Sequence, residues 1–146
     1  MRHRILLVED NAADVRLLRQ ALRDTGVPLE LQVADDGEAA TEILFQRGAH
    51  RNASRPDLVL LDLNLPKKGG LDVLREVKLD ESLRGIPVMV LSSSRRESDV
   101  NRAYEYGANL YVSKPSDLDD LEDMARFIAK GWLRYGVLPT DSPSRG

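Results

Sequence analysis

Apolar and polar positions alternate along the chain in two ways. Short, mostly apolar runs predict five strands, at residues 5–8, 29–34, 58–61, 88–91 and 109–113. Between and after these runs, apolar residues recur every three to four positions, which predicts helices around 15–22 and at about 38–46, 69–79, 96–106 and 117–135. Three of the strand segments are aliphatic at every position, so we expect helices to cover both faces of the sheet.

The regular alternation of strand and helix determines the expected architecture. Right-handed strand–helix–strand crossovers give an α/β fold with an open parallel sheet. We predict a flavodoxin-like, doubly wound sheet of five strands in the order 2-1-3-4-5, with five helices. Residues 1–137 are expected to form one domain. Residues 138–146 hold two prolines and show no periodicity, so a flexible tail is predicted there.

The last predicted helix has an amphipathic pattern. At about 100° per residue, one stripe should face the sheet, and it consists of Leu118, Leu121, Ala125, Ile128 and Trp132. Met124 lies at the edge of this stripe, and Phe127 lies outside it, exposed to water in a monomer.

Composition excludes several classes of protein. The 146 residues contain no cysteine, which rules out disulfides and thiolate metal sites, and only two histidines. The net charge of −3 argues against general nucleic-acid binding. The unbroken aliphatic runs of the predicted strands are four residues long, too short to span a membrane. We therefore expect a cytoplasmic protein that binds neither nucleic acid nor membrane.

Carboxylates follow two strands that are neighbours in the predicted order. Glu9 and Asp10 come directly after the first strand, and Asp62 follows the third. The carboxyl ends of parallel strands meet at one edge of the sheet, where ligands bind in such folds. Three carboxylates at one edge repel each other, and a hard divalent cation such as Mg²⁺ or Mn²⁺ relieves that repulsion.

A hydroxyl and a cation follow the last two strands at this edge. Ser92 comes after the fourth strand and Lys114 after the fifth. Taken singly, these residues have plainer interpretations: the acids as helix N-terminal or turn residues, Ser92 as a helix cap, and Lys114 as a solvated lysine. Their occurrence in order at successive strand ends favours a phosphoryl-transfer site.

The ordered set of residues is Glu9-Asp10, Asp62-Leu-Asn-Leu-Pro66 with Gly69-Gly70, Ser92, and Tyr111-Val-Ser-Lys114-Pro115. Over about residues 4–135 it resembles the receiver domain of two-component response regulators. Two shorter stretches, from Asp62 to Gly69 and from Arg126 to Leu133, resemble the single-domain regulators that are paired with phytochrome-type histidine kinases.

The resemblance implies an aspartyl-phosphate switch rather than an enzyme. Asp62 would accept a phosphoryl group from a sensor histidine kinase or a small donor. The carboxylates of Asp10 and Asp62 and the backbone carbonyl of Asn64 would coordinate Mg²⁺, with Glu9 holding a metal-bound water. Lys114 would neutralise charge on the transferring group.

The resemblance also implies a conformational response. Ser92 would hydrogen-bond the acyl phosphate, and Tyr111 would rotate toward the space that the serine vacates. The face formed by the fourth helix, fifth strand and fifth helix would then change. Pro115 would be a cis proline. On that face we expect a homodimer interface, with Met124 and Phe127 buried against their symmetry mates.

Three other functions fit the sequence less well. A phosphatase of the haloacid dehalogenase type needs an Asp-x-Asp nucleophile after its first strand and a cap insertion, neither of which fits this chain. A flavin-binding redox module needs a phosphate-binding loop after the first strand, and residues 11–14 are not one. A receiver retained only as a scaffold has little support, because every chemical position is filled.

Overall fold

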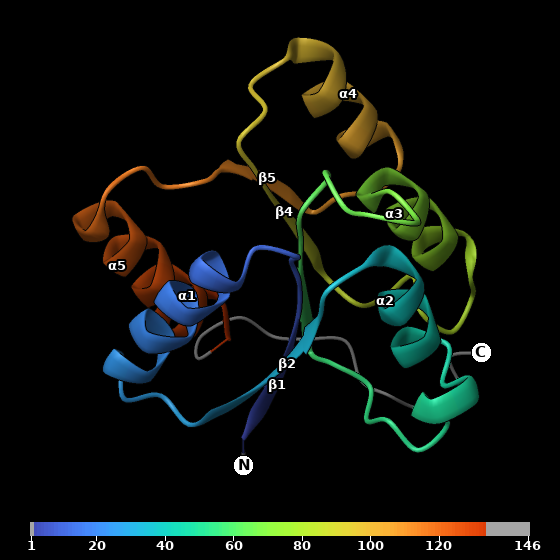
Figure 1. Ribbon diagram of the computed structural model, residues 1–146, viewed down its shortest axis with the longest axis horizontal. Coiled ribbons are helices and arrows are strands. Elements are labelled where there is room, and N and C mark those ends of the chain that lie inside the picture. The colour runs from blue at the N-terminus through green and yellow to red at the C-terminus, as the bar shows by residue number, and fades with distance from the viewer. Residues whose placement is uncertain (1, 134–146) are drawn as a thin grey trace.

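Figure 1 shows the computed structural model, in which residues 2–133 are described. Five parallel strands form one sheet in the order β2-β1-β3-β4-β5, so the predicted topology is confirmed. The strands are β1 (His3–Val8), β2 (Leu29–Ala34), β3 (Leu58–Leu61), β4 (Val88–Ser92) and β5 (Leu110–Ser113).

Helices cover both faces of this sheet. They are α1 (Ala12–Asp24), α2 (Gly37–Leu44), α3 (Gly70–Leu79), α4 (Glu97–Glu105) and α5 (Leu118–Arg126), with a short 3₁₀ helix η1 (Gly48–His50) and a π-helix η2 (Phe127–Leu133). Figure 1 shows α1 and α5 on one side and α2, α3 and α4 on the other. Among residues 2–133, no helix is long and apolar enough to cross a membrane.

The continuous aliphatic strands build two cores at once, because successive side chains point to opposite faces. In β1, Leu6 and Val8 join the core beneath α2, α3 and α4, whereas Ile5 and Leu7 join the core beneath α1 and α5. All four are buried. This two-sided burial confirms the expectation of helices on both faces.

Polar residues begin three of the helices. The side chain of Asn11 accepts a hydrogen bond from the third residue of α1, Asp36 does the same in α2, and Asp117 in α5, over 2.7–3.0 Å. Each side chain satisfies one N–H group that the helix leaves without an internal partner. The caps therefore set where these helices start relative to the strand ends before them.

The predicted apolar stripe of the last helix was wrong at its first residue, since Leu118 is 60% exposed. Ile128 is buried as expected, and Trp132 packs, partly buried, against the core beneath α1 and α5. At the far end the backbone is a π-helix, whose i→i+5 hydrogen bonds put more residues in each turn. Ala129 and Leu133, which lie outside the predicted stripe, also join this core. The predicted helix end at 135 and the tail at 138–146 lie outside the described residues.

Candidate functional site

Three carboxylates meet where β1 and β3 end, because these strands are paired with Val8 beside Leu61. One carboxylate oxygen each from Glu9, Asp10 and Asp62 lies within 4.8 Å of the others. Glu9 and Asp62 are buried, and Asp10 is exposed. The predicted convergence of these acids is therefore present, with one side of the cluster open to solvent.

Lys114 enters this cluster from the end of β5. Its Nζ lies 2.6 Å from Oε1 of Glu9, 3.2 Å from Oδ2 of Asp62 and 3.3 Å from Oδ2 of Asp14. Sequence reasoning missed Asp14. Its position in the first turn of α1, one helical turn after Asp10, was the available signal.

Burial and charge act in opposite directions on these groups. Burial alone would lower the pKa of Lys114, but its hydrogen bond to Glu9 and the charges of Asp62 and Glu9 outweigh burial and raise that pKa above its ordinary value. Burial raises the pKa of Glu9 above its usual range, against the lowering effect of its hydrogen bond to Lys114. The lysine therefore stays cationic at neutral pH.

The backbone after Asp62 is held close to its side chain. The N–H of Asn64 donates to Oδ1 of Asp62 over 3.3 Å. Gly70, the first residue of α3, packs directly on this segment, since a Cβ there would lie 2.2 Å from the carbonyl oxygen of Asp62. Only glycine permits this approach, so Gly70 helps to fix the loop that carries Asn64.

Ser92, the last residue of β4, is completely buried at the same edge. Its backbone carbonyl accepts a hydrogen bond from the N–H of Lys114 over 2.9 Å, which ties the ends of β4 and β5 together. Its Oγ accepts from the N–H of Ser94 over 3.1 Å. The hydroxyl is thus at the predicted edge, beside the end of β3.

Tyr111 on β5 is turned toward the core. Its partly buried ring packs against the core beneath α2, α3 and α4, and its hydroxyl donates to the carbonyl of Ser94 over 2.8 Å. Tyr104, which sequence reasoning missed, accepts a hydrogen bond from the backbone N–H of Tyr111 over 3.0 Å. Nothing in the strand pattern distinguishes Tyr104 from other exposed helical residues.

The expectation of a cis bond before Pro115 was wrong, since residues 2–133 contain no cis peptide bond. The trans form is the favoured state of a bond before proline. The ammonium group of Lys114 lies beside Glu9 and Asp62 with this bond in the trans form.

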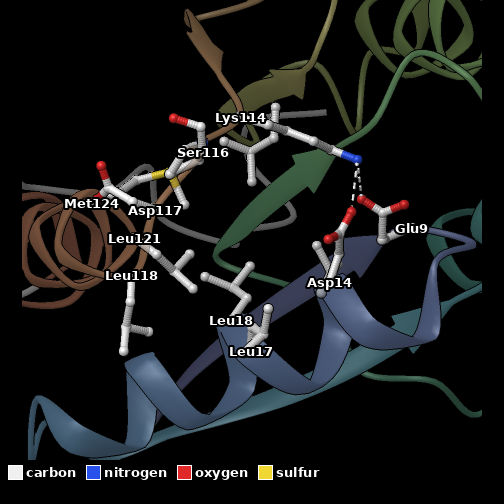
Figure 2. A pocket seen from close by; sticks show the side chains of 13 residues that line it. Glu9, Asp14, Leu17, Leu18, Lys114, Ser116, Asp117, Leu118, Leu121 and Met124 are labelled. Atoms are coloured by element: carbon white, nitrogen blue, oxygen red, sulfur yellow. Dashed lines mark hydrogen bonds and ion pairs between the residues drawn. The ribbon is translucent and has the colours of Figure 1, made fainter.

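An apolar pocket of about 310 Å³ adjoins the acidic cluster, between α1 and α5. Figure 2 shows Leu17 and Leu18 of α1 facing Leu118 and Leu121 of α5 across it. One end of the pocket is lined by charged groups, namely the carboxylates of Glu9 and Asp14 and the ammonium of Lys114. A molecule that fills this pocket would therefore touch the charged cluster.

Comparison with known proteins agrees with this geometry. Residues 5–126 match the response regulator receiver domain family. Response regulator Rcp1 of Synechocystis sp. is 46% identical over 135 residues, which cover 92% of each chain. The crystal structure of Mn²⁺-bound Rcp1 has a TM-score of 0.89 at 45% identity, covering 94% of this chain and 99% of that one. For the phosphorylated cyanobacterial phytochrome response regulator RcpA, the TM-score is 0.91 at 46% identity, covering 96% and 100%. The chain belongs to the response regulator receiver domain family.

Proposed function

We propose that this chain is a single-domain response regulator, with residues 1–137 as its receiver domain, and that it accepts a phosphoryl group on Asp62. The observation that carries the proposal is the cluster of Glu9, Asp10 and Asp62 with the ammonium of Lys114 against it. Family membership and the phosphorylated relative RcpA support it.

In the proposed reaction, a carboxylate oxygen of Asp62 forms a bond to phosphorus. The phosphorus–nitrogen bond of a phosphohistidine breaks, and its electron pair leaves with the imidazole; with acetyl phosphate, acetate leaves instead. Lys114 remains protonated because the neighbouring acids raise its pKa. Its charge therefore stabilises the negative oxygens of the transferring group. Because the protein itself is the phosphoryl acceptor, the proposed role is in signalling, and its proposed reactions are limited to its own phosphorylation and dephosphorylation.

The donor set suits a hard divalent cation, since all three clustered groups are carboxylates. Asp10, Asp62 and the backbone carbonyl of Asn64 would hold Mg²⁺, and Glu9 would contact it through water. When bound, Mg²⁺ supplies further positive charge to the phosphoryl oxygens. The Mn²⁺-bound form of Rcp1 supports a divalent metal for this family.

The phosphoryl donor that we propose is a sensor histidine kinase of the phytochrome type, acting in the cytoplasm. The supporting facts are the 46% identity to RcpA, a phytochrome response regulator, and to Rcp1. The apolar pocket beside Lys114 offers a surface for side chains of the donor, because it opens next to the acidic cluster.

We propose that phosphorylation changes the face formed by α4, β5 and α5, and that this face binds a protein partner. Nucleic acid and membrane are not among the proposed partners. Ser92 would bind the phosphoryl group, and Tyr111 would report it to this face through their common neighbour Ser94. We also propose a homodimer on this face through Met124 and Phe127, of which Phe127 is 49% exposed.

Intact-mass spectrometry tests the phosphorylation. After treatment with acetyl phosphate and Mg²⁺, the mass should show one phosphoryl adduct, and none should form with EDTA. Asp62→Asn should remove the adduct, whereas Asp57→Asn, which changes an aspartate before β3, should retain it. An adduct that persists in Asp62→Asn would end the assignment.

A further inference from the structure

Ser94 connects the end of β4, the strand β5 and the start of α4 through hydrogen bonds. Its N–H donates to Oγ of Ser92, and its carbonyl accepts from the Tyr111 hydroxyl. Its own hydroxyl donates to Oδ2 of Asp99 over 2.5 Å and accepts from the N–H of Arg96 over 3.3 Å. The loop between β4 and α4 is thus hydrogen-bonded to a strand end, a neighbouring strand and a helix through one residue.

The hydrogen bond from Ser94 determines which further hydrogen bonds the Ser92 hydroxyl can make. A serine hydroxyl has one proton to donate and accepts through its lone pairs. Within residues 2–133, Ser92 Oγ accepts a hydrogen bond from the N–H of Ser94, and no side-chain hydrogen bond has Ser92 Oγ as its donor. The buried Ser92 hydroxyl already accepts a hydrogen bond through its oxygen. Its O–H can therefore donate to an anionic oxygen at this edge.

We propose that Asp99 is a positioning residue for phosphorylation: by holding Ser94, it keeps the Ser92 hydroxyl as an unpaired donor for the phosphoryl group. The inference rests on the proposed function of Asp62. Asp99 itself does not touch the phosphoryl group and acts only through the two serines.

Three features make Asp99 suited to this role. Its bond to Ser94 is charge-assisted and short, which is the stronger kind of hydrogen bond. Asp99 lies in the first turn of α4, where the helix dipole favours a negative charge. Its backbone N–H donates to the carbonyl of Arg96, so a second hydrogen bond, besides the one to Ser94, holds Asp99 at the start of α4. The carboxylate is therefore a fixed point to which the loop is attached.

Binding of beryllofluoride, a phosphoryl analogue, in saturating Mg²⁺ tests the proposal. Asp99→Ala should weaken binding by about threefold to tenfold, the range expected for loss of one supporting hydrogen bond. Asp99→Asn should recover most of the affinity, because its amide oxygen still accepts from Ser94. Ser94→Ala removes the same bond from the other side and should match Asp99→Ala, and the double variant should be no weaker than either single one.

Glu97→Ala is the matched control. Glu97 is an exposed acid in the same turn of α4, so this change removes the same charge and should leave beryllofluoride binding within about twofold of wild type. Mg²⁺ affinity measured without beryllofluoride should not change in any of these variants. Equal weakening by Glu97→Ala, or parallel loss of Mg²⁺ affinity, would overturn the proposal in favour of a general charge or folding effect.

A Ser92→Ala background separates positioning from other effects. Without the Ser92 hydroxyl, Asp99→Ala should cause no further loss of affinity, because the residue acts through that hydroxyl. The same loss in both backgrounds would overturn the role of Asp99 while leaving Asp62 as the acceptor. If the wild-type protein binds no beryllofluoride, the proposed function fails together with this inference.

Discussion

The ammonium of Lys114 lies closer to Glu9 than to Asp62, at 2.6 Å against 3.2 Å. Glu9 is therefore the main partner of the lysine in this structure, although Asp62 is the proposed phosphoryl acceptor. Both acids are buried, so each depends on this cation to offset the loss of hydration. The lysine thus stabilises the folded cluster as well as serving the proposed chemistry.

Replacing Lys114 with methionine should lower the free energy of unfolding by about 2 kcal/mol in EDTA, because it leaves two buried carboxylates without their cation. This figure is below the range for fully buried pairs because the side chain of Lys114 is 23% exposed. Urea unfolding followed by circular dichroism measures the loss. Asp14→Asn is the control: its side chain is 45% exposed and it keeps the Lys114–Glu9 pair, so it should cost under about 0.5 kcal/mol. Equal free energies of unfolding for Lys114→Met and wild type would contradict the expected role of the lysine in stabilising the cluster.

The strand order and the acidic cluster could be predicted because both depend on patterns that are local in sequence. Aliphatic runs identified β1, β3 and β4, and parallel pairing then required Glu9 and Asp62 to meet at one edge. Contacts between distant side chains carry no such local signal. The bonds of Asp14 to Lys114 and of Tyr104 to Tyr111 depend on how helices pack on the finished sheet.

The end of the last helix could not be predicted for a different reason. A periodicity of 3.6 residues assumes one helix type throughout, whereas the backbone changes to a π-helix at Phe127. Nothing in the apolar pattern from Leu118 to Trp132 marks that change. The error therefore concerns which residues face the sheet and not whether a helix is present.

Asp36 should make stability depend on pH. Its carboxylate accepts a hydrogen bond from the N–H of Ala39 and lies 3.5 Å from Nζ of Lys67; the first contact most of all lowers its pKa below the usual value. A carboxyl whose pKa is lower in the folded state contributes stability above its unfolded pKa, and this contribution is lost as pH falls through the folded pKa. Asp36→Ala should thus cost about 1 kcal/mol near pH 7 and progressively less below about pH 4.

Urea unfolding of wild type and Asp36→Ala across pH 2.5 to 7, roughly the range over which aspartate titrates, tests this expectation. Asp36→Asn is the matched control, since asparagine also caps helices but does not titrate. Its stability difference from wild type should shrink as pH falls. A difference between Asp36→Ala and wild type that stays constant over the whole range would show that the carboxylate is not responsible.

Leu17 should matter for phosphotransfer from a kinase and not for phosphorylation by acetyl phosphate. Its side chain lines the apolar pocket (Figure 2) and is 51% exposed. This pocket is the surface that we propose a protein donor contacts. Leu17→Asp should slow transfer from a phosphorylated kinase by about tenfold or more, the effect of losing a buried apolar contact and placing a charge there. Leu79→Asp, at a 74% exposed leucine on α3, is the control. Equal slowing with both donors would mean that Leu17 supports the fold or the cluster instead.

Phe127 should determine the oligomeric state. Its ring is 49% exposed and packs edge-on against Trp132, with 6.3 Å between ring centroids, so an interface on α5 and η2 would bury both aromatic groups. Large aromatic side chains contribute most of the binding energy at many interfaces. Light scattering coupled to gel filtration should give about twice the 16.3 kDa chain mass, and Phe127→Asp should give the monomer mass. Leu79→Asp adds the same charge on α3 and should remain dimeric.

A wild-type monomer at high micromolar concentration, with and without acetyl phosphate, would exclude the interface. Circular dichroism establishes that Phe127→Asp is folded, so a monomer mass for it then reports loss of the interface rather than of the fold.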